Sequence, residues 1–430
     1  MAKDKSIPAT EQLDFHSFKQ QVIQDYQLAC ESREASLLGR KEVLTGKAKF
    51  GIFGDGKELA QIALAKQFRN GDFRSGYYRD QTLMMAISAL TLEQYFAGLY
   101  AHTDVEIEPQ SAGRQMGGHY ATRNLDQNGN WKDLMAQKNS SSDISPTAGQ
   151  MPRLLGLAQA SKVYREHPTL KELEAFQKFT NGGNEVAFGT IGDASTSEGP
   201  FWETMNAAGV LQVPMVMSVW DDGYGISVPR ELQTTKGSIS DALAGFQRNA
   251  EQKGFEIFVT KGWDYAHLCE TYEKAVQIAR DEHVPVLVHV KEVNQPQGHS
   301  TSGSHERYKS EERLQWESEF DCISKFKHWI LSFGEKGVVL ATEEELEQIA
   351  ASAKERVKNA KNTAWQLFTE DIQQDKNELL LVLASFAQTH PLHAQASTLH
   401  QQLSREKDSI RRDLLSNVKS ILRQSLHDQS

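Results

Sequence analysis

Four continuous apolar runs in the middle of the chain constrain its fold more than any other feature. They cover residues 185–191 (EVAFGTI), 214–220 (PMVMSVW), 255–260 (FEIFVT) and 284–290 (VPVLVHV), and helix-like segments such as FWETMNAAGVL and YAHLCETYEKAVQIARDE separate them. Apolar runs without polar alternation are typical of strands buried on both faces, and their alternation with helices is typical of parallel sheets. The sequence therefore predicts a three-layer α/β fold, with a mostly parallel sheet and helices on both faces.

Three of these runs are followed by glycine-rich polar loops, GDAS, DDGYGIS and NQPQGHSTSGSH. Ligands of parallel sheets bind at the carboxyl ends of the strands, so we expect the three loops to lie together. Asp193 and Asp222 would then point to one spot, and Mg²⁺ commonly takes one or two carboxylates together with ligand phosphates. Gly192 permits a sharp turn, and the amides that open the next helix at residues 195–199 suit a diphosphate. The pattern predicts a magnesium–diphosphate site.

Each acidic loop also has an ordinary structural explanation. An aspartate after a strand is most often the N-cap of the next helix, and taken alone Asp193 fits that role better than metal binding. The Asp-Asp-Gly triplet at 221–223 is a common turn sequence. GDGKE at 54–58 lacks the Lys-Ser/Thr pair of a phosphate loop and is also typical of a turn. The prediction of a metal site therefore depends on the loops meeting.

Composition narrows the classes of ligand and partner. The formal net charge of −10 over 430 residues argues against binding nucleic acid. Cys30, Cys269 and Cys322 have neither disulfide nor zinc-site spacing, which fits a reducing compartment. The N-terminus lacks the pattern of a signal or transit peptide. The run LLLVLASFA at 379–387 is far shorter than the roughly 20 residues of a membrane span, so we expect a cytoplasmic protein without a membrane partner.

Helical patterns cover most of the remaining chain. Residues 11–45 are expected to form a helix, and the apolar segment 82–100 (TLMMAISALTLEQYFAGLY) a single helix, whereas residues 103–150 are loop-like. Thr342 and Glu345 have the spacing of a capping box before an amphipathic helix. The apolar segments TLMMAISAL and LLLVLASFA are expected to be exposed on the isolated chain and buried by subunit contact.

The two acidic loops, GDASTSEG and DDGYGISVP, resemble the two ends of the thiamin-diphosphate motif. Together with SGYYRD, GRQMGGHY, SPTAGQMP and GHSTS, they make residues 20–370 similar to alpha subunits of the decarboxylating component of 2-oxoacid dehydrogenase complexes, of the branched-chain and pyruvate types. The resemblance implies a thiamin-diphosphate-binding fold. The implied divisions are an N-terminal helical arm (1–50), the diphosphate-binding α/β domain (51–330), C-terminal helices (331–376) and a helical extension (377–430) like the connector of fused alpha/beta chains.

The resemblance also implies the residues that bind the cofactor. The Mg²⁺ ligands would be the carboxylates of Asp193 and Asp222 and the main-chain carbonyl of Tyr224. Taken alone, Arg79 would be read as a surface arginine paired with Asp80, but its planar guanidinium suits phosphate. The residues implied to bind thiamin diphosphate are Tyr78, Arg79, Ser145, Thr147, Gly192, Asp193, Ala194, Ser195, Asp222, Ile226 and His299.

Two histidines are implied to serve catalysis. His299 lies in GHSTS and matches the active-site histidine of the family, and His119 matches a second histidine near the cofactor. A histidine can donate to a developing oxyanion or transfer a proton near neutral pH. For any single histidine, a solvated loop position is the more ordinary explanation, and the neighbouring Gly298 and the Ser/Thr run favour the functional one for His299.

The sequence departs from the family pattern around the predicted site. Ala194 stands where glycine is usual, and the Asp-Asp pair at 221–222 stands where Asn-Asn is usual. Trp220 occupies the position of a phosphate-contacting arginine in some relatives, and Gln295 replaces a basic residue upstream of His299. Oxygen ligands are retained, so Mg²⁺ binding is still expected, but we expect the site to be less positive than in those relatives.

The resemblance implies an alpha subunit that carries out thiamin-diphosphate-dependent oxidative decarboxylation of a small 2-oxoacid, most closely of the 2-oxoisovalerate type. The acyl group would pass to the lipoyl domain of the acyltransferase component. A beta subunit or region with the pyrimidine-binding domain would complete the site in an alpha2-beta2 assembly, so the chain alone is expected to be inactive. Pyruvate and acetoin are alternative substrates. A non-catalytic assembly subunit with a degenerate cofactor motif is an alternative of another class.

Overall fold

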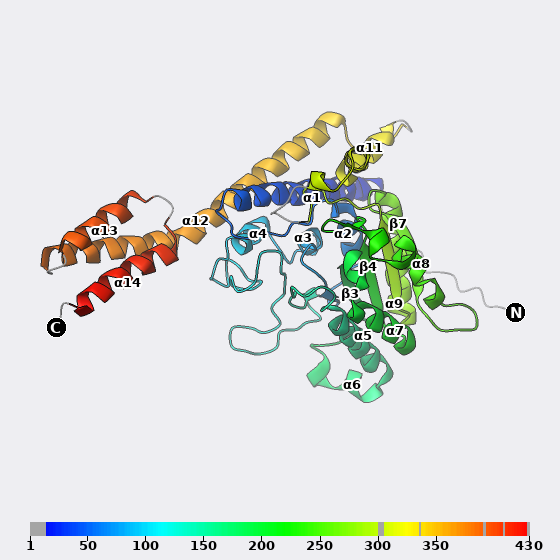
Figure 1. Ribbon diagram of the computed structural model, residues 1–430. Coiled ribbons are helices and arrows are strands. Elements are labelled where there is room, and N and C mark those ends of the chain that lie inside the picture. The colour runs from blue at the N-terminus through cyan, green and yellow to red at the C-terminus, as the bar shows by residue number, and fades with distance from the viewer. Residues whose placement is uncertain (1–13, 300–304, 335–336, 390–392, 407–408, 428–430) are drawn as a thin grey trace. The chain divides into compact units, whose positions relative to one another are not determined.

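The computed structural model describes residues 14–299, 305–334, 337–389, 393–406 and 409–427. Within these residues a six-stranded sheet has the order β2-β1-β3-β4-β8-β7, and all of its strand pairs are parallel (Figure 1). The strands are β1 (Phe73–Ser75), β2 (Asn139–Ser140), β3 (Ala187–Gly192), β4 (Met215–Trp220), β7 (Glu256–Lys261) and β8 (Val286–Lys291). The four apolar runs form β3, β4, β7 and β8, which confirms the predicted parallel α/β sheet.

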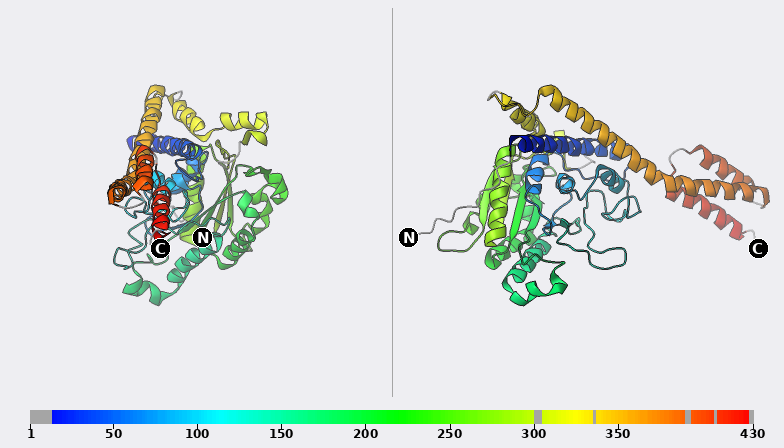
Figure 2. Two further views of the ribbon diagram at one scale, coloured as in Figure 1. Left: turned by 60° about the vertical axis from the view of Figure 1, so that its left-hand side comes forward. Right: turned by 180° about the vertical axis from the view of Figure 1, so that it is seen from behind.

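Helices cover both faces of this sheet, which Figure 2 shows from two further sides. Met217 of β4 belongs to a buried core with side chains of α5 (Met151–Glu166) and α7 (Gly199–Leu211). The next residue, Ser218, points to the opposite face, as alternate strand residues do. There its hydroxyl accepts a hydrogen bond at 3.0 Å from Tyr272 of α9 (Tyr265–Glu282). The three-layer arrangement is therefore confirmed.

The order of the strands reverses between β1 and β3. From β1 the sheet continues to β2 on one side, and from β3 it continues to β4, β8 and β7 on the other. The loops after β1 and β3 thus leave the sheet in opposite directions and open a crevice between their carboxyl ends. In doubly wound sheets, this switch point is where ligands bind.

The predicted helix 82–100 is wrong, because the chain forms two short helices there. Ser88 adopts a left-handed backbone with φ of 62° after the first helix, and Thr91 begins the second by exchanging capping-box hydrogen bonds with Gln94. The expected exposure of TLMMAISAL is also wrong, since Leu83 and Met84 are fully buried in the core of the chain itself. The helices of this part are α1 (Phe15–Leu44), α2 (Glu58–Ala65), α3 (Gln81–Ala86), α4 (Leu92–Leu99), α6 (Pro168–Glu172), α8 (Ile239–Ala242), α10 (Glu311–Glu319) and α11 (Cys322–Ser332).

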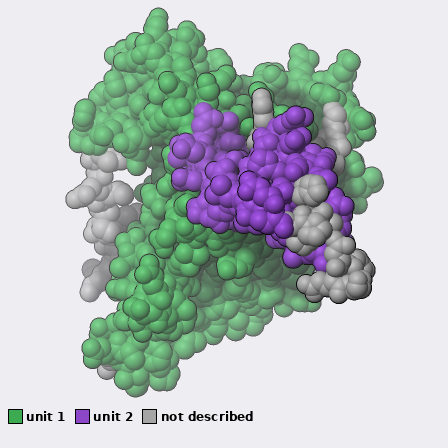
Figure 3. All heavy atoms as spheres, turned by 90° about the vertical axis from the view of Figure 1, so that its left-hand side faces the viewer, with its two compact units in different colours: residues 1–360 green, residues 361–430 purple. Residues whose placement is uncertain are grey.

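The chain divides into two compact units, residues 1–360 and 361–430, which Figure 3 distinguishes by colour. The second unit contains the end of α12 (Glu343–Thr389) with α13 (His393–Arg405) and α14 (Arg411–His427). The predicted capping box at the start of α12 is confirmed, because Thr342 and Glu345 exchange hydrogen bonds of 2.8 and 3.2 Å. The domain boundary predicted at 376/377 falls within the continuous α12, and the predicted boundaries remain predictions.

One face of α12 forms the core of the second unit. The core consists of Ile372, Leu383, Ala396, Leu403, Leu414 and Ile421. The expected exposure of LLLVLASFA on the isolated chain holds for one face only, since Leu381 is 73% exposed but Leu383 is 3% exposed. Within the described residues, no helix combines the length and the apolar character needed to cross a membrane.

Candidate active site

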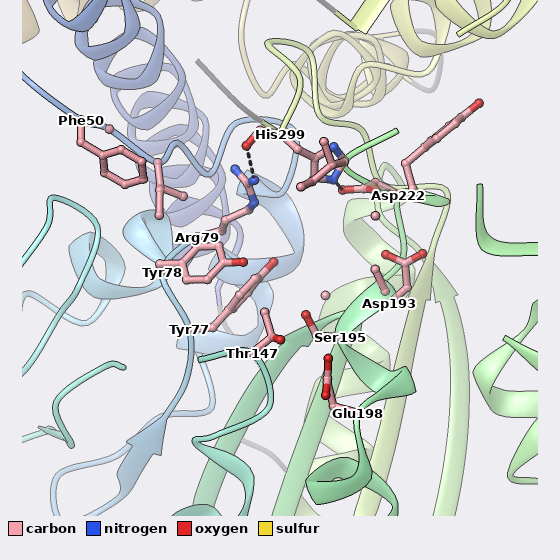
Figure 4. Close-up of a pocket in the computed structure, with 17 residues that line it drawn as sticks. Phe50, Tyr77, Tyr78, Arg79, Thr147, Asp193, Ser195, Glu198, Asp222 and His299 are labelled. Carbon is pink, nitrogen blue, oxygen red and sulfur yellow. Dashed lines mark hydrogen bonds and ion pairs between the residues drawn. The ribbon is translucent and has the colours of Figure 1, made fainter. Parts of the chain in front are cut away.

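A cavity of about 430 Å³ lies at the switch point, at the carboxyl ends of β1, β3 and β4 (Figure 4). The segments that line it follow different strands of the sheet, as expected for loops that meet at one edge. Of the predicted site residues, the cavity is lined by Tyr78, Arg79, Thr147, Gly192, Asp193, Ala194, Ser195, Asp222, Tyr224, Ile226 and His299. Ser145 and His119 do not line it. The structure thus brings the three loops together, while the roles predicted for their residues remain predictions.

Asp193 does not cap a helix with its side chain. Its main-chain carbonyl accepts hydrogen bonds from the amide and the hydroxyl of Thr196, whereas its Oδ2 is buried without a hydrogen-bond partner among the described residues. Burial, followed by the charges of Asp222 and Asp221, raises the pKa of Asp193 well above its ordinary range. The interpretation of Asp193 as an ordinary N-cap is therefore wrong. The residue is a buried acid whose exposed fraction is only 6%.

Asp222 lies on the same side of the cavity as Asp193 (Figure 4) and is held by several donors. Its Oδ1 accepts the main-chain N–H of Tyr224 at 3.2 Å. Its Oδ2 lies 3.1 Å from both Nζ of Lys57 and Nε2 of His299. Burial alone would raise the pKa of Asp222, but the charges of His299 and Lys57 hold that pKa well below its ordinary value. Asp222 is therefore the ionised acid of the cavity.

The neighbouring Asp221 does not line the cavity. Its Oδ2 accepts hydrogen bonds of 3.0 Å from Nη1 of Arg230 and from Nε2 of His289, a fully buried histidine whose Nδ1 lies 2.9 Å from the hydroxyl of Ser240. The two aspartates of DDG thus point to separate cations, Asp221 to Arg230 and Asp222 to Lys57.

Arg79 forks between two loops at the edge of the cavity. Its Nη1 donates to the carbonyl of Phe53 at 2.5 Å, and its Nη2 donates to the carbonyl of His299 at 3.0 Å. Its guanidinium also lies 5.7 Å from the centroid of the Tyr78 ring. The carboxylate of Asp80 is bound by Arg74, and the side chain of Arg79 is buried. The interpretation of Arg79 as a surface residue paired with Asp80 is therefore wrong.

The loop after β3 differs from the predicted helix start. Residues Ala194–Ser197 form a separate 3₁₀ turn, and α7 begins only at Gly199. The methyl group of Ala194 is accommodated by Gly225 of the facing loop, since a Cβ at Gly225 would lie 2.7 Å from it. The alanine that departs from the family pattern therefore fits without filling the cavity.

The loop after β4 forms a two-residue hairpin, β5 (Tyr224–Gly225) with β6 (Val228–Pro229). Ile226 lies at its tip with a φ of 59°, and its side chain is 63% exposed at the mouth of the cavity. The Tyr224 ring packs near Tyr308, with ring centroids 5.7 Å apart.

His119 and Ser145 form a pair beside the cavity. Nε2 of His119 lies 3.0 Å from the hydroxyl of Ser145, and its Nδ1 lies 2.9 Å from the carbonyl of Met116. The His119 ring is 6.2 Å from that of Tyr78, which does line the cavity. His119 therefore contacts a residue that lines the cavity but does not line it itself.

Trp220 is fully buried and does not line the cavity. Its indole Nε1 lies 3.4 Å from Oδ1 of Asp80, so this tryptophan belongs to the packing beneath the site. Asp80 in turn accepts hydrogen bonds from Arg74 and Thr190. Trp220, which stands in place of the arginine of some relatives, thus changes the packing around the site but does not fill the cavity.

Lys57 contacts a cavity residue, Asp222, and was not predicted from the sequence. It lies in GDGKE, which has the composition of a surface turn, yet its side chain is only 1% exposed. No local signal identifies it, because its partners Asp222 and Gln295 come from the loops after β4 and β8. Only the meeting of those loops shows its position.

The donor set of the cavity fits a hard cation that arrives with phosphate. Among the described residues, no three His, Cys, Asp or Glu side chains are arranged to hold a metal ion. The protein would supply two carboxylates, and phosphate and water oxygens would complete the six ligands that Mg²⁺ takes. The unpartnered Oδ2 of Asp193 supports this fit, since a buried polar atom without a partner costs free energy that a cation would recover.

A doubly wound parallel sheet with such a cavity at its switch point defines the class of α/β proteins that bind a phosphate-bearing ligand at the sheet edge. Within that class, the chain belongs to the dehydrogenase E1 component family, whose sequence pattern matches residues 34–372. This confirms the resemblance to the E1 alpha components of 2-oxoacid dehydrogenases. The family is dependent on thiamin diphosphate in general.

Curated relatives carry the names of alpha subunits. The chain is 24% identical over 325 residues to the 2-oxoisovalerate dehydrogenase subunit alpha of Bacillus subtilis, covering 75% of this chain and 84% of that protein. It is 24% identical over 290 residues to the mitochondrial 2-oxoisovalerate dehydrogenase subunit alpha of Homo sapiens, covering 67% of this chain and 56% of that protein. It is 28% identical over 188 residues to the pyruvate dehydrogenase E1 component subunit alpha of Rickettsia bellii, covering 43% of this chain and 53% of that protein. The chain thus spans about half the length of the last two relatives.

Proposed function

We propose that this chain is the alpha component of a dehydrogenase for a branched-chain 2-oxoacid of the 2-oxoisovalerate type, and that its cavity binds thiamin diphosphate with Mg²⁺. The observation that carries the proposal is the buried, unpartnered Oδ2 of Asp193 beside the ionised Asp222, in a cavity at the switch point of the sheet. Membership of the E1 component family and the names of the Bacillus and human relatives support the choice of substrate.

The cofactor would be held from both sides of the cavity. The carboxylates of Asp193 and Asp222 and the carbonyl of Tyr224 would bind Mg²⁺, and Tyr78 and Arg79 would face the diphosphate. When bound, thiamin diphosphate supplies the nucleophilic carbon and the electron sink that decarboxylation of a 2-oxoacid needs. The remaining residues proposed to contact it are Ser145, Thr147, Gly192, Ala194, Ser195 and Ile226.

His299 is proposed to handle a proton at Nδ1. Its Nε2 is hydrogen-bonded to Asp222, and its Nδ1 has no hydrogen-bond partner among the described residues. In the charged ring, Nδ1 also carries a proton. Once the ring is neutral, the ionised Asp222 favours the tautomer with its proton on Nε2, which leaves the lone pair on Nδ1 free. A histidine in that state can accept a proton from a reacting group and return it. His119 would act through Ser145, which it contacts directly.

The mouth of the cavity supports an assembly with a partner. Phe50 and Ile226, which line the cavity, are 41% and 63% exposed, and Val228 and Leu232, which follow Ile226 in the chain, are 42% and 79% exposed. Clusters of exposed apolar side chains mark surfaces that a partner covers. We propose that a beta subunit or region with the pyrimidine-binding domain covers it in an alpha2-beta2 assembly. The lipoyl domain of the acyltransferase component then receives the acyl group, in the cytoplasm.

Pyruvate is the second candidate substrate, supported by the relatives of Rickettsia that are named pyruvate dehydrogenase alpha subunits. A non-catalytic assembly subunit is less well supported. The altered residues that motivate it leave the cavity open, since Trp220 is buried beneath it and Asp221 turns to Arg230.

The test is an assay of 2-oxoacid decarboxylation with a dye acceptor, on the full chain with and without its copurified beta partner. We expect no turnover by the chain alone. With the partner, we expect a higher kcat/KM for 2-oxoisovalerate than for pyruvate. A higher kcat/KM for pyruvate would assign the second substrate. Absence of turnover with both substrates, although thiamin diphosphate is bound, would contradict the proposed activity.

A further inference from the structure

The turn at residues 54–57, Gly-Asp-Gly-Lys, is buried beneath the cavity and places an ammonium group under Asp222. Nζ of Lys57 lies 3.1 Å from Oδ2 of Asp222, 2.8 Å from Oε1 of Gln295 and 3.1 Å from the carbonyl of Asn294. A lysine ammonium has three N–H donors, and these three acceptors use all of them. Lys57 is therefore fully satisfied in a position that water does not reach.

The turn itself is fixed on two sides. A Cβ at Gly54 would collide with the carbonyl oxygen of Arg79, and a Cβ at Gly56, whose φ is 88°, would collide with the carbonyl oxygen of Asn294. Between them, the carboxylate of Asp55 accepts hydrogen bonds from Nε2 of Gln295 at 3.0 Å and from the main-chain N–H of Gln297 at 2.9 Å. Lys57 thus projects from a backbone that the surrounding loops hold in place.

The turn also connects the two loops that carry Asp222 and His299. Lys57 and Asp55 both bind Gln295, which lies four residues before His299. Oδ2 of Asp222 lies 3.1 Å from Nζ of Lys57 and 3.1 Å from Nε2 of His299. One carboxylate oxygen therefore joins the buried cation to the cavity histidine.

A buried cation costs a large desolvation free energy unless a buried anion and hydrogen bonds compensate it. Lys57 does not line the cavity, so a ligand there would contact Asp222 and not the ammonium itself. Paired with Lys57, the carboxylate of Asp222 offers an oxygen to a cation while the pair as a whole carries no net charge. That condition suits a site that must accept both Mg²⁺ and an anionic diphosphate.

We propose that Lys57 is a positioning residue of the cofactor site, which fixes and neutralises Asp222 so that this carboxylate faces Asp193 in one orientation. The inference rests on the proposed binding of magnesium thiamin diphosphate. Lys57 and Asp222 then act as one functional unit, and removing the charge of either partner alone weakens binding of the cofactor. Without Lys57, Asp222 keeps only the hydrogen bonds of His299 and the Tyr224 amide and faces the diphosphate with less of its charge compensated. Without the charge of Asp222, a buried ammonium faces Mg²⁺.

A double-mutant cycle tests this unit, because residues that act together show non-additive effects. Magnesium thiamin diphosphate is titrated by calorimetry into the full chain with its copurified partner, for the parent, K57M, D222N and K57M/D222N. We expect each single substitution to weaken binding by at least about 10-fold, the range found for residues that orient metal ligands. The double variant, which replaces the ion pair by a neutral pair, is expected to bind more tightly than either single variant.

The matched control is K376M, which removes another buried lysine, one that donates to the carbonyl of Glu406 in the second compact unit. It is expected to leave cofactor affinity unchanged. If a single variant fails to fold, the double variant K57M/D222N decides the outcome. A folded double variant whose affinity for magnesium thiamin diphosphate is within about 10-fold of that of the parent supports the Lys57–Asp222 unit. Additive losses, or a double variant weaker than both singles, would overturn the inference. A parent that does not bind the cofactor would instead contradict the proposed function.

Discussion

Arg79 holds the main chain of His299, with its Nη2 donating to the His299 carbonyl at 3.0 Å. The same guanidinium donates to the carbonyl of Phe53 through Nη1. A residue proposed to face the diphosphate is thus already the bridge between the loop after β8 and the segment before α2. We therefore expect binding of phosphate and placement of the histidine loop to be coupled through this side chain.

R79K is expected to separate the charge of this residue from its geometry. A lysine keeps the positive charge but cannot donate from a planar fork to two carbonyls at once. We expect the free energy of unfolding to fall by about 1–2 kcal/mol, the size of a buried hydrogen bond left unmade, with a roughly 10-fold loss of thiamin diphosphate affinity, as found for residues that orient metal ligands. Urea denaturation and calorimetry measure the two effects. The exposed R114K serves as control, and unchanged affinity in R79K would contradict the coupling.

D193N is expected to stabilise the protein in the absence of ligand. The carboxylate of Asp193 is buried, has an unpartnered Oδ2 and lies near two further acids. Removing the ionisable group should raise the free energy of unfolding by about 1 kcal/mol, since functional sites store such unfavourable contacts. Thermal unfolding near neutral pH measures the change. E198Q, an exposed acid that lines the same cavity, should leave the stability within about 0.5 kcal/mol, and a destabilised D193N would show that the carboxylate is structural.

His283 is expected to make stability depend on pH. Burial, with the nearby charge of Arg165, lowers the pKa of His283 to about 4, and its Nε2 donates to the carbonyl of Gly183 at 3.0 Å. An unfolded histidine binds a proton near pH 6.5, so the contribution of His283 is complete above that pH and is lost as the pH falls toward 4. The slope should be at most about 1 kcal/mol per pH unit after screening by water.

The variant H283N tests this dependence. Asparagine tolerates the left-handed backbone at this position, where φ is 54°, and its amide can donate to the same carbonyl. Urea denaturation between pH 7 and pH 4 should give a shallower loss of stability in H283N than in the parent. Parallel pH profiles of the two proteins would show that His283 is not the titrating group.

Leu383 and Leu381 provide a matched pair for the second compact unit. They lie two residues apart on α12, but Leu383 is 3% exposed and Leu381 is 73% exposed. L383A should destabilise this unit by about 2–4 kcal/mol, as large-to-small substitutions in a core do. L381A should have an effect below about 0.5 kcal/mol. Hydrogen exchange of the amides in α13 and α14 reports the difference, and equal exchange in the two variants would contradict the three-helix core.

The parts of the fold that the sequence predicted are those with a continuous local pattern. The runs that form β3, β4 and β8 are largely apolar, and these strands are buried as that composition predicts. The run that forms β7 also predicts a strand, but β7 lies at the edge of the sheet and is only partly buried. The two short strands β1 and β2 were not predicted, because Arg74 and Asn139 give them a polar composition. Those side chains are buried only because distant partners satisfy them, such as Asp143 for Arg74 and the carbonyl of Leu134 for Asn139.

The same distinction holds for the site. Asp193 and Asp222 could be paired because both follow predicted strands of one parallel sheet, and the cavity brings them together as expected. The interactions that decide their charge states could not be predicted. Lys57 lies in a turn far along the sequence, and Arg230 lies beyond the hairpin that begins at Tyr224. The positions of these compensating charges depend on which loops contact one another in the folded protein, and the spacing of residues along the sequence does not predict those contacts.

The central claim is that Asp193 and Asp222 together hold Mg²⁺ for thiamin diphosphate. Calorimetric titration of the full chain with its copurified partner, with and without Mg²⁺, tests it most directly when the parent is compared with D193A. We expect the parent to bind thiamin diphosphate only in the presence of Mg²⁺. We expect D193A to lose at least about 100-fold in affinity, because removing a metal ligand costs at least as much as removing a residue that orients one. Binding by D193A that equals that of the parent, or binding by the parent that is independent of Mg²⁺, would contradict it.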